Sequence, residues 1–327
     1  MAYKPPYTIT SKMLDYIGEI MKYIGRLTSG NGLDNKPKLR RSNRIKSIYS
    51  SLVIENNVLS EKQVKDIING KLVVGPKKDI LEVKNAIRVY DDILTINPYN
   101  LEELLKYHRI MLESLINDNG HYRIHQEGVF DGDQVIHYAP SHELVPELMS
   151  NLFDYLNNYD ENILIKSCVF HYEIEFIHPF SDGNGRMGRL FQTCLLASKE
   201  KIFTYLPIES IIEERQDEYY NVINQSNKNG SSNLFIEFML DAILETIKRI
   251  LTSSKDINES VSIQVKRLLI IMQEGIPYTT QEIMKLLKMK SRVSCKKNYI
   301  NPSMSIGLIK MTIPDKPQSR NQRYIKV

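Results

Sequence analysis

The sequence predicts a mainly α-helical protein with one β-hairpin and a small C-terminal domain that mixes helices and strands. Three observations indicate this fold class. Apolar residues recur at the spacing of an amphipathic helix through most of the chain. An Asp-Gly pair at 131–132 separates two apolar runs, which is typical of a β-hairpin. Beyond residue 260 the chain alternates short helix and strand patterns and is rich in Lys and Arg.

The N-terminal part of the chain carries clear helix signals. Ser11 is a predicted N-cap, and apolar residues follow it at intervals of three and four up to Leu27. A basic stretch over residues 36–46 leads into a second, short helix. Asn100 is also a predicted N-cap, with Glu103 completing a capping box. The predicted helices before the hairpin cover residues 11–27, 45–54, 64–68, 83–96 and 101–116.

The middle of the chain continues the helical pattern after the hairpin, which is predicted over residues 124–136. Residues 225–233 are polar and contain a glycine, so we expect a surface loop there. Residues 252–259 are also polar and are expected to link two domains. The predicted helices after the hairpin cover residues 144–156, 163–177, 185–198, 208–223 and 234–251. The predicted domains are an N-terminal helical region 1–80, a core 81–251, a linker 252–259 and a C-terminal domain 260–327.

Composition and charge exclude several classes of protein. With 327 residues, of which 42% are apolar, the chain can form an ordinary buried core. No segment has the length and apolar character of a signal peptide or a membrane helix, so we expect a cytoplasmic protein without a membrane partner. Cys168, Cys194 and Cys295 are far apart in the sequence and are expected to be reduced. From Lys266 onward, 13 basic residues face three acidic ones, which bears on binding partners.

A glycine-containing turn is predicted between two helices, within residues 178–189. A helix has to end at His178, because Pro179 disfavours helical geometry in the residue before it. Gly183 and Gly185 give the following backbone the freedom to turn its N–H groups toward one point. They stand directly before a new helix, whose N-terminus carries partial positive charge. The segment therefore has the elements of an anion-binding site.

Four side chains in this segment can act on a bound phosphate. His178 titrates near neutral pH, as a general base must. Asp182 offers a hard oxygen ligand for Mg²⁺, which usually takes one or two carboxylates beside the phosphates of its substrate. Arg186 and Arg189 are three residues apart on one helix face and can each hold phosphate oxygens with two hydrogen bonds. Each feature alone is common, but their combination within twelve residues predicts a phosphate-binding catalytic site.

The segment His-Pro-Phe-Ser-Asp-Gly-Asn-Gly-Arg-Met-Gly-Arg at 178–189 resembles the signature of the Fic family at every fixed position. The resemblance covers about 81–251. It implies a Fic-type helical bundle and a nucleotidyl transfer, usually of AMP from ATP to a Ser, Thr or Tyr hydroxyl of a target protein. It also implies that His178 deprotonates this hydroxyl and that Asp182 holds Mg²⁺. The implied nucleotide-binding residues are Phe180, which also anchors the loop in the core, Gly183, Asn184, Gly185, Arg186 on the β-phosphate and Arg189 on the γ-phosphate.

Two further regions fit this resemblance. The hairpin at 124–136 stands where the family has its target-docking flap, and its edge can hold a segment of a protein substrate by strand addition. An ordinary surface hairpin is the alternative. Tyr219 and Tyr220 resemble the residues on the adenine side of the site, where an aromatic ring can stack on the base. At helical spacing, one of these two tyrosines is expected in the core.

A second motif precedes the core. Residues 51–56, Ser-Leu-Val-Ile-Glu-Asn, resemble the inhibitory motif of the family, (Ser/Thr)-x-x-x-Glu-(Gly/Asn), with Asn56 at its last position. Ser51 and Glu55 are four residues apart and lie on the same side of a helix. The resemblance implies that Glu55 pairs with Arg189, takes the place of the γ-phosphate and prevents productive ATP binding. A solvated surface glutamate is the alternative interpretation, and in some relatives the same glutamate serves AMP removal.

The basic C-terminal domain has the predicted order helix, helix, strand, loop, strand, with helices at 279–287 and 293–300 and a loop at 314–323. This pattern resembles a winged helix-turn-helix. Such a domain binds DNA phosphates or serves as a protein interaction module, and the sequence leaves both open. A homodimer also stays open, because the sequence does not set the oligomeric state. The candidate DNA-binding residues are Arg292, Lys296, Lys297, Lys316, Arg320 and Arg323.

Three functions compete at the level of the sequence. The first is protein adenylyl transfer with ATP as co-substrate and Mg²⁺ as cofactor, inhibited by Glu55. The second is a Fic enzyme that uses another donor, such as UTP or CDP-choline, or that removes AMP. The third is a DNA-binding regulator whose Fic core only senses a nucleotide. The presence of both His178 and Asp182 speaks against this third function.

Overall fold

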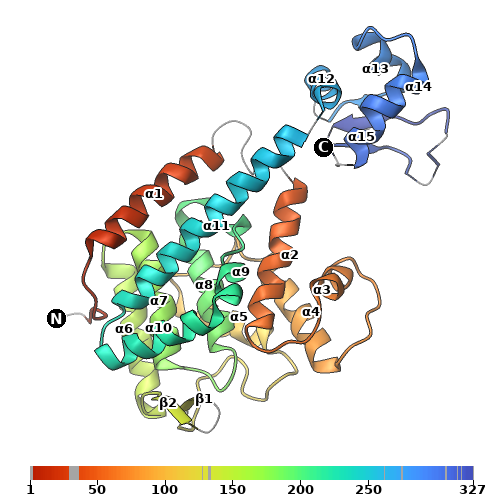
Figure 1. The fold of residues 1–327 in the computed structure, drawn as a ribbon. Coiled ribbons are helices and arrows are strands. Elements are labelled where there is room, and N and C mark those ends of the chain that lie inside the picture. The colour runs from red at the N-terminus through yellow and green to blue at the C-terminus, as the bar shows by residue number, and fades with distance from the viewer. Residues whose placement is uncertain are drawn as a thin grey trace. The chain divides into compact units, whose positions relative to one another are not determined.

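The computed structural model describes residues 3–28, 37–126, 128–131, 134–260, 262–273, 275–305, 308–314, 316–317 and 319–326. The chain divides into two compact units, Met1–Arg249 and Ile250–Val327. The first unit is a helical bundle with one short hairpin, and the second has short strands among several helices (Figure 1). The predicted fold class, mainly α with little β structure, is confirmed.

The first unit consists of helices that follow one another closely along the chain (Figure 1). The last of them, α11, runs past the end of the unit. In chain order the elements are α1 (Ser11–Thr28), α2 (Pro37–Val53), α3 (Glu61–Ile68), α4 (Lys77–Asp91), α5 (Leu101–Met111), β1 (Gly128–Asp131), β2 (Gln134–Tyr138), η2 (His142–Leu144), α6 (Val145–Asn158), α7 (Ile163–Ile177), α8 (Asn184–Lys199), η3 (Lys201–Tyr205), α9 (Ile208–Glu214), α10 (Gln216–Asn229) and α11 (Asn233–Ser260).

Helices α7 and α8 form the centre of the first unit. Nearly all of α7 is buried, and α8 is buried from Asn184 to Leu196. A helix such as α7, whose sequence is apolar on all sides, belongs in the interior of a bundle. The two helices come very close together, because a Cβ atom on Gly188 would lie 2.7 Å from the ring of His171. This packing holds the N-terminus of α8 beside the C-terminus of α7.

Several predicted boundaries differ from the structure, and three of them have a clear local cause. Helix α10 continues through most of the predicted loop 225–233 and ends before Gly230, whose φ of 60° is the left-handed conformation that ends many helices. Helix α11 continues through the predicted linker 252–259, because that segment contains neither Pro nor Gly to end it. Helix α2 begins at Pro37 and not near Ile45, since proline fits the first turn of a helix.

Two predicted helix caps also need correction. At the start of α1, the hydroxyl of Thr10, not that of Ser11, accepts the capping hydrogen bond from a backbone N–H at 3.2 Å. Asn100 caps α5 as predicted, accepting from the second backbone N–H of the helix at 2.8 Å. The predicted capping box is wrong, because the Glu103 side chain pairs with Lys106 at 2.9 Å. A capping box requires the N-cap side chain to accept from the third backbone N–H of the helix. Asn100 accepts from the second N–H instead, so no box forms.

The predicted hairpin is confirmed in the middle of the chain. Strands β1 and β2 pair antiparallel, with Gly128 opposite Tyr138 and Asp131 opposite Gln134. The register shifts within β1, an irregularity of the kind that bends a strand. Gly132, the glycine of the predicted Asp-Gly turn, lies outside the described residues.

The second unit has a small apolar core of its own, which includes Leu268, Ile283 and Ile300. Its strands form an antiparallel sheet in the order β3-β5-β4. The predicted helices and strands are present, and α12 and β3 are additional elements that the sequence analysis missed. The elements are α12 (Ile263–Ile271), β3 (Pro277–Tyr278), α13 (Thr280–Leu286), α14 (Arg292–Cys295), η4 (Lys296–Ile300), α15 (Asn301–Ser305), β4 (Ile309–Met311) and β5 (Tyr324–Lys326).

The structure also describes the helices and the cysteines in relation to membrane spans and thiol reactivity. Among the described residues, none of the helices is both long enough and apolar enough to cross a membrane. The three cysteines are free and buried. Burial raises the pKa of the Cys168 thiol to about 12, so this side chain stays protonated and unreactive at neutral pH.

Candidate active site

The turn between α7 and α8 begins where the sequence predicted. Helix α7 ends at Ile177, and His178 adopts a left-handed backbone conformation with a φ of 50° and a ψ of 58°. Pro179 prevents the helix from continuing. The His178 side chain is half-buried, and its Nδ1 atom has no hydrogen-bond partner among the described residues. A buried polar atom without a partner is costly, so this nitrogen is a candidate contact for a ligand.

Asn184 closes the turn on itself. Its Oδ1 accepts from the backbone N–H of Phe180 at 2.9 Å, and its Nδ2 donates to the Phe180 carbonyl at 2.8 Å. The residue is 3% exposed. The Asn184 side chain therefore shapes the turn, and its backbone N–H, at the start of α8, is the group that can meet an anion.

Phe180 anchors the turn in the core. Its ring is fully buried and stacks on the ring of His108, with centroids 3.7 Å apart and planes 10° apart. The His108 Nδ1 accepts from the backbone N–H of Gly120 at 2.8 Å, and its Nε2 donates to the Asp182 carbonyl at 2.9 Å. A ring with one accepting and one donating nitrogen is neutral. Burial keeps it neutral, lowering the pKa of His108 to about 4.

Arg123 binds the backbone at the end of α7. Its Nε donates to the His178 carbonyl at 2.7 Å, and its Nη2 donates to the carbonyls of Ile177 and Pro140 at 3.3 and 2.6 Å. Its backbone N–H donates to the Pro179 carbonyl at 2.9 Å. The residue is 2% exposed. A cation is favourable at the C-terminus of a helix, and this one fixes the backbone of His178.

Arg186 lies in the first turn of α8 and is almost completely buried. Its Nη2 donates to Asp182 Oδ1 at 2.6 Å, and its Nη1 lies 3.7 Å from Glu82. Its Nε is buried without a hydrogen-bond partner among the described residues. A guanidinium with an unused donor beside a helix N-terminus suits a phosphate oxygen.

Arg189 is paired with the end of α2. Its Nη2 donates to Glu55 Oε1 at 2.6 Å and to the Ser51 carbonyl at 3.0 Å, and its Nε donates to Ser51 Oγ at 3.2 Å. Burial works against the charged guanidinium. The Glu55 carboxylate outweighs this effect and raises the pKa of Arg189 above its usual value. The structure thus contains the contact between Glu55 and Arg189 that the motif predicted.

The Glu55 carboxylate also reaches the N-terminus of α8. A Cβ atom on Gly185 would lie 2.5 Å from Glu55 Oε1, so glycine is required there while this carboxylate is in place. Asn56, which follows Glu55, has a φ of 65°, a left-handed conformation that Asn and Gly tolerate better than other residues. The start of α8 therefore already accepts one anion, the carboxylate of Glu55.

Behind the turn lies a buried polar cluster that the sequence analysis did not predict. The Tyr219 hydroxyl donates to Glu175 at 2.9 Å and lies 3.0 Å from His171 Nε2. Burial by itself raises the pKa of Glu175, but its contacts with His171 and Arg189 lower it to about 2. Glu175 is therefore ionised and adds a second negative charge near Arg189.

The two neighbouring tyrosines of α10 have different environments. Tyr219 is completely buried, with its ring near Phe235 and Phe238. The expectation that Tyr219 stacks on a base is wrong for this structure, because its ring is enclosed by the core. Tyr220 is 40% exposed, and its hydroxyl lies 3.5 Å from the Ile54 carbonyl. Tyr220 is therefore the tyrosine that a ligand can contact.

Most residues predicted from the sequence meet at this turn, but two of its supports were missed. His108 lies on the buried face of α5 with Leu104 and Met111, a helical spacing that could have indicated an internal histidine. No sequence pattern marks Arg123. The predicted residues at the turn are His178, Phe180, Asp182, Gly183, Asn184, Gly185, Arg186 and Arg189, and Ser51 and Glu55 meet them from the end of α2.

The six predicted DNA-binding residues are on the second unit. Five of them are exposed and Lys296 is half-exposed. Arg323 lies 4.0 Å from Glu282, so its charge is partly compensated. The exposed residues of this set are Arg292, Lys297, Lys316, Arg320 and Arg323.

Asp182 is the residue of the turn whose chemistry fits a divalent cation. Its side chain is 37% exposed, with one carboxylate oxygen 2.6 Å from Arg186. Within the described part of the chain, no group of three or more His, Cys, Asp or Glu side chains could hold a metal ion. A single half-exposed carboxylate fits Mg²⁺, which keeps several waters and binds substrate phosphates.

The fold and this site define a known class of protein. Residues 98–196 match the Fic/DOC family, and residues 263–325 match the C-terminal domain of the Fic-like proteins named for filamentation induced by cAMP. The structure is similar to the crystal structure of a Fic family protein from Desulfovibrio desulfuricans G20. The TM-score is 0.74, with 39% identity over 99% of this chain and 98% of that chain. This chain belongs to the Fic family.

Curated relatives and a further structure show how far the similarity extends. The protein adenylyltransferases Fic of Nematostella vectensis and Aedes aegypti are each 27% identical to this chain over 75% of its length. The matches cover 57% and 49% of those proteins, so the chain spans about half the length of the curated relatives it matches. The fold is also similar to Fic-1 of C. elegans, with a TM-score of 0.62 and 19% identity over 75% of this chain and 73% of that chain.

Proposed function

We propose that this protein transfers AMP from ATP to a hydroxyl group of a target protein. The observation that carries this proposal is the Glu55 carboxylate, which lies as an anion against Arg189 and Gly185 at the start of α8. A nucleotide phosphate has the charge and the oxygen atoms to take the same place. The names of the curated relatives, protein adenylyltransferases, support AMP as the transferred group.

In this reaction His178 takes the proton of the attacking hydroxyl, because its half-buried imidazole stands where the turn begins. The hydroxyl oxygen bonds to the α-phosphorus, and pyrophosphate leaves. Arg186 and Arg189 bind the β- and γ-phosphate oxygens, and the backbone N–H groups around Gly185 bind the α- and β-phosphates. The rate gain comes from positioning and charge stabilisation, which a turn fixed by Asn184 and Phe180 supplies in advance.

Asp182 is the residue that would hold Mg²⁺ beside the phosphates. The ion supplies charge stabilisation of the phosphate oxygens when bound. Arg186 donates to the same carboxylate at 2.6 Å and keeps it oriented toward the turn. We expect EDTA to abolish AMP transfer and excess Mg²⁺ to restore it, which a time course of label incorporation measures. Undiminished transfer in EDTA would contradict a role for the ion.

We assign the target to the hairpin and the adenine base to Tyr220 of α10. Strand β2 contacts α10, and the free edge of the hairpin can take a target segment as an added strand. The exposed ring of Tyr220 is proposed to contact the base. The first assignment rests on the position of the hairpin beside α10, and the second on the exposure of Tyr220.

Glu55 is proposed to inhibit the reaction. Its carboxylate uses the Arg189 donor that a γ-phosphate requires, at a distance of 2.6 Å. Two anions cannot share this guanidinium at low cost, because they repel each other in a buried site. ATP in a productive position therefore requires Glu55 to leave. The same carboxylate can instead direct a water molecule in AMP removal, and the experiment below includes this alternative.

Label position tests the proposed transfer directly. We expect incorporation from ATP labelled at the α-phosphate, none from ATP labelled at the γ-phosphate, and an intact-mass gain of one AMP. His178→Ala should abolish incorporation. His121→Ala is the matched control, since this histidine is exposed and should leave incorporation unchanged. Label from the γ-phosphate would contradict AMP transfer and indicate phosphorylation.

Parallel incubations separate the alternatives. A mass gain with UTP or CDP-choline, but not with ATP, would assign another donor. Loss of AMP from a previously modified target would assign the reverse reaction. No covalent change with any donor, in wild type and in Glu55→Gly, would overturn the enzymatic proposal and favour a core that only senses nucleotides.

The second unit is proposed to bind DNA phosphates. Its order of elements, α12-β3-α13-α14, followed by η4, α15, β4 and β5, resembles a winged helix-turn-helix, and its basic side chains are exposed. Anisotropy of labelled duplex DNA should show binding that weakens steeply with salt, because counterions are released from the DNA. Arg292→Gln should reduce the salt slope by about one. A DNA affinity that does not depend on salt concentration, or no DNA binding, would favour a protein interaction module.

A further inference from the structure

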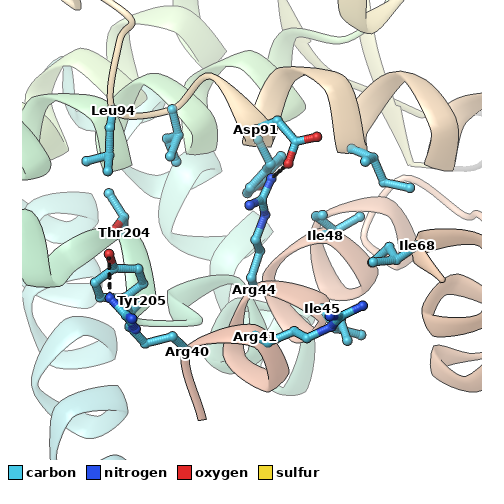
Figure 2. Close-up of a pocket in the computed structure, with 13 residues that line it drawn as sticks. Arg40, Arg41, Arg44, Ile45, Ile48, Ile68, Asp91, Leu94, Thr204 and Tyr205 are labelled. Atoms are coloured by element: carbon cyan, nitrogen blue, oxygen red, sulfur yellow. Dashed lines mark hydrogen bonds and ion pairs between the residues drawn. The ribbon is translucent and has the colours of Figure 1, made fainter. Parts of the chain in front are cut away.

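A pocket with a cavity volume of about 440 Å³ lies on the N-terminal half of α2 (Figure 2). It shares no lining residue with the turn between α7 and α8. Three arginines of α2, Arg40, Arg41 and Arg44, line it together with a single acidic residue, Asp91 at the end of α4. Its apolar lining comes from three helices and the segment after α4, and consists of Ile45, Ile48, Ile68, Ile87, Ile93 and Leu94.

Two of these arginines have only neutral partners among the described residues. Arg40 donates to the Tyr205 hydroxyl at 3.2 Å, and its guanidinium lies 5.0 Å from the centre of the Tyr205 ring. Arg41 donates to the Asn69 side chain at 2.6 Å. Arg44 forms an ion pair with Asp91, as Figure 2 shows. The pocket therefore has an excess of positive charge that the described residues do not compensate.

The position of the arginines on α2 adds to this excess. A helix N-terminus carries partial positive charge, which favours acidic residues in the first turn. Helix α2 has no acidic residue in its first turn, and Arg40, Arg41 and Arg44 follow within its first eight residues. An anion bound among them relieves the repulsion between these charges and the helix.

We propose that this pocket binds a small molecule that carries a phosphate monoester on an apolar body. The planar guanidinium groups offer paired donors that match phosphate oxygens. The isoleucine side chains give the apolar body a surface that excludes water. A volume of about 440 Å³ is in the range of ordinary small-molecule sites.

Ligand binding here acts on α2, the helix that ends two residues before Glu55. One face of α2 is attached through hydrogen bonds, such as Asn43 to the Tyr205 carbonyl and Ser47 to Glu209, each 2.9 Å long. Ile45, Ile48 and Leu52 of this helix are buried as well, so α2 leaves this position only by local opening. A ligand that bridges α2 to Tyr205 favours the attached position by mass action, about tenfold at ten times its Kd. This part of the inference rests on the proposed inhibitory role of Glu55.

Calorimetric titration of the full chain with phenyl phosphate tests the binding site. We expect saturable binding that benzyl alcohol, the neutral analogue, does not reproduce. The double variant Arg40→Gln, Arg41→Gln should weaken binding at least tenfold, since each lost charged donor weakens an anion complex by about 10-fold or more. Arg88→Gln removes an exposed arginine outside the pocket and should bind like the wild type.

A gain-of-binding variant guards against misfolding as an explanation. Asp91→Asn removes the single acidic lining residue and should tighten phenyl phosphate binding about threefold or more, because a negative charge beside the ligand is lost. Equal affinities of the wild type, the double arginine variant and Asp91→Asn would overturn the site. Inorganic phosphate should bind more weakly than phenyl phosphate, and equal binding would overturn the role of the apolar wall.

Hydrogen exchange tests the effect on α2 without relying on enzymatic activity. Saturating phenyl phosphate should slow amide exchange in residues 45–55 of the wild type and leave it unchanged in the double arginine variant. If the ligand binds but exchange in this segment is unchanged or faster, the coupling to α2 is overturned. If exchange slows but AMP transfer is absent under all conditions, the proposed function is wrong, whereas the phosphate-binding pocket on α2 is still supported.

Discussion

The turn between α7 and α8 and the segment 51–56 that meets it are held by different kinds of contact. The turn is fixed by buried groups that cannot be removed without damage, namely the ring of Phe180 on His108 and the guanidinium of Arg123 on backbone carbonyls. The segment also buries Leu52 and Ile54 in the core, but the Glu55 side chain itself is 26% exposed and is held by its ion pair with Arg189.

This difference separates a permanent part of the site from a reversible one. Removing a large buried aromatic ring costs about 3–5 kcal/mol, whereas a typical hydrogen bond contributes about 1 kcal/mol. The Glu55 carboxylate can therefore leave Arg189 while the turn and the buried residues of α2 stay in place. Under the proposed inhibition, the catalytic site is complete before Glu55 departs, and each prediction below acts on one side of the comparison.

Phe180→Ala should have the largest effect on stability. The ring is fully buried and stacked, so its loss should lower the free energy of unfolding by about 3–5 kcal/mol. Urea denaturation measures this difference. Val58→Ala, at a side chain that is 72% exposed, should change it by less than about 0.5 kcal/mol. A loss below about 1 kcal/mol for Phe180→Ala would contradict the view that the turn is rigidly anchored.

Arg123→Met should have the next largest effect. It leaves the carbonyls of His178 and Pro140 without a buried donor, which should cost about 2–3 kcal/mol of unfolding free energy. AMP transfer should fall as well, because the backbone of His178 loses its support. Arg88→Met, at an exposed ion pair, is the control and should be nearly neutral. Full activity of Arg123→Met would show that the turn does not depend on this guanidinium.

Asn56→Val should act on the reversible side. Valine in the left-handed conformation of Asn56, with a φ of 65°, costs about 1–2 kcal/mol and should free Glu55 from Arg189. We expect AMP transfer to rise about 5–30-fold, measured as label incorporated per minute. Asn56→Gly accepts the same backbone angle and should stay inhibited. Equal rates of AMP transfer for the two variants would show that the backbone conformation of residue 56 does not affect inhibition.

Glu209→Gln should have the smallest effect, visible as a change in pH dependence. The Glu209 carboxyl accepts from Ser47 at 2.9 Å, and burial raises its pKa above the usual value. A raised folded-state pKa means that this stability is fully present below the ordinary pKa and is lost as pH rises through the raised value. As pH rises above the ordinary pKa of a glutamate, about 4, the variant should therefore lose less stability than the wild type. Urea denaturation of both proteins at each pH measures this difference. Equal losses of unfolding free energy in the wild type and the variant would contradict a neutral Glu209 at low pH.

The sequence predicted the parts of this site that are local in the chain. His178, Gly183 and Arg189 were found because a proline, a glycine turn and a helix face are visible within a few residues. The pairing of Glu55 with Arg189 followed from family resemblance, since 134 residues separate the two side chains. Periodicity does not reveal Arg123, because its partners are backbone carbonyls that any sequence provides.

Errors in the fold have equally local causes. The predicted loop 225–233 and linker 252–259 are polar, but polarity alone does not end a helix. Helix α10 continues until Gly230, and α11 meets no Pro or Gly in the predicted linker. Tyr219 and Tyr220 could not be told apart by composition, because the difference in their burial depends on the packing of α10 against α7 and α11.

The rate of AMP incorporation in Glu55→Gly, compared with wild type, tests the central claim that an assembled transferase is held inactive by one carboxylate. Loss of a charged contact of this type should raise the rate about 10–100-fold, and adding His178→Ala to the same variant should abolish incorporation. An unchanged rate in Glu55→Gly, or incorporation that survives the loss of His178, would contradict the account.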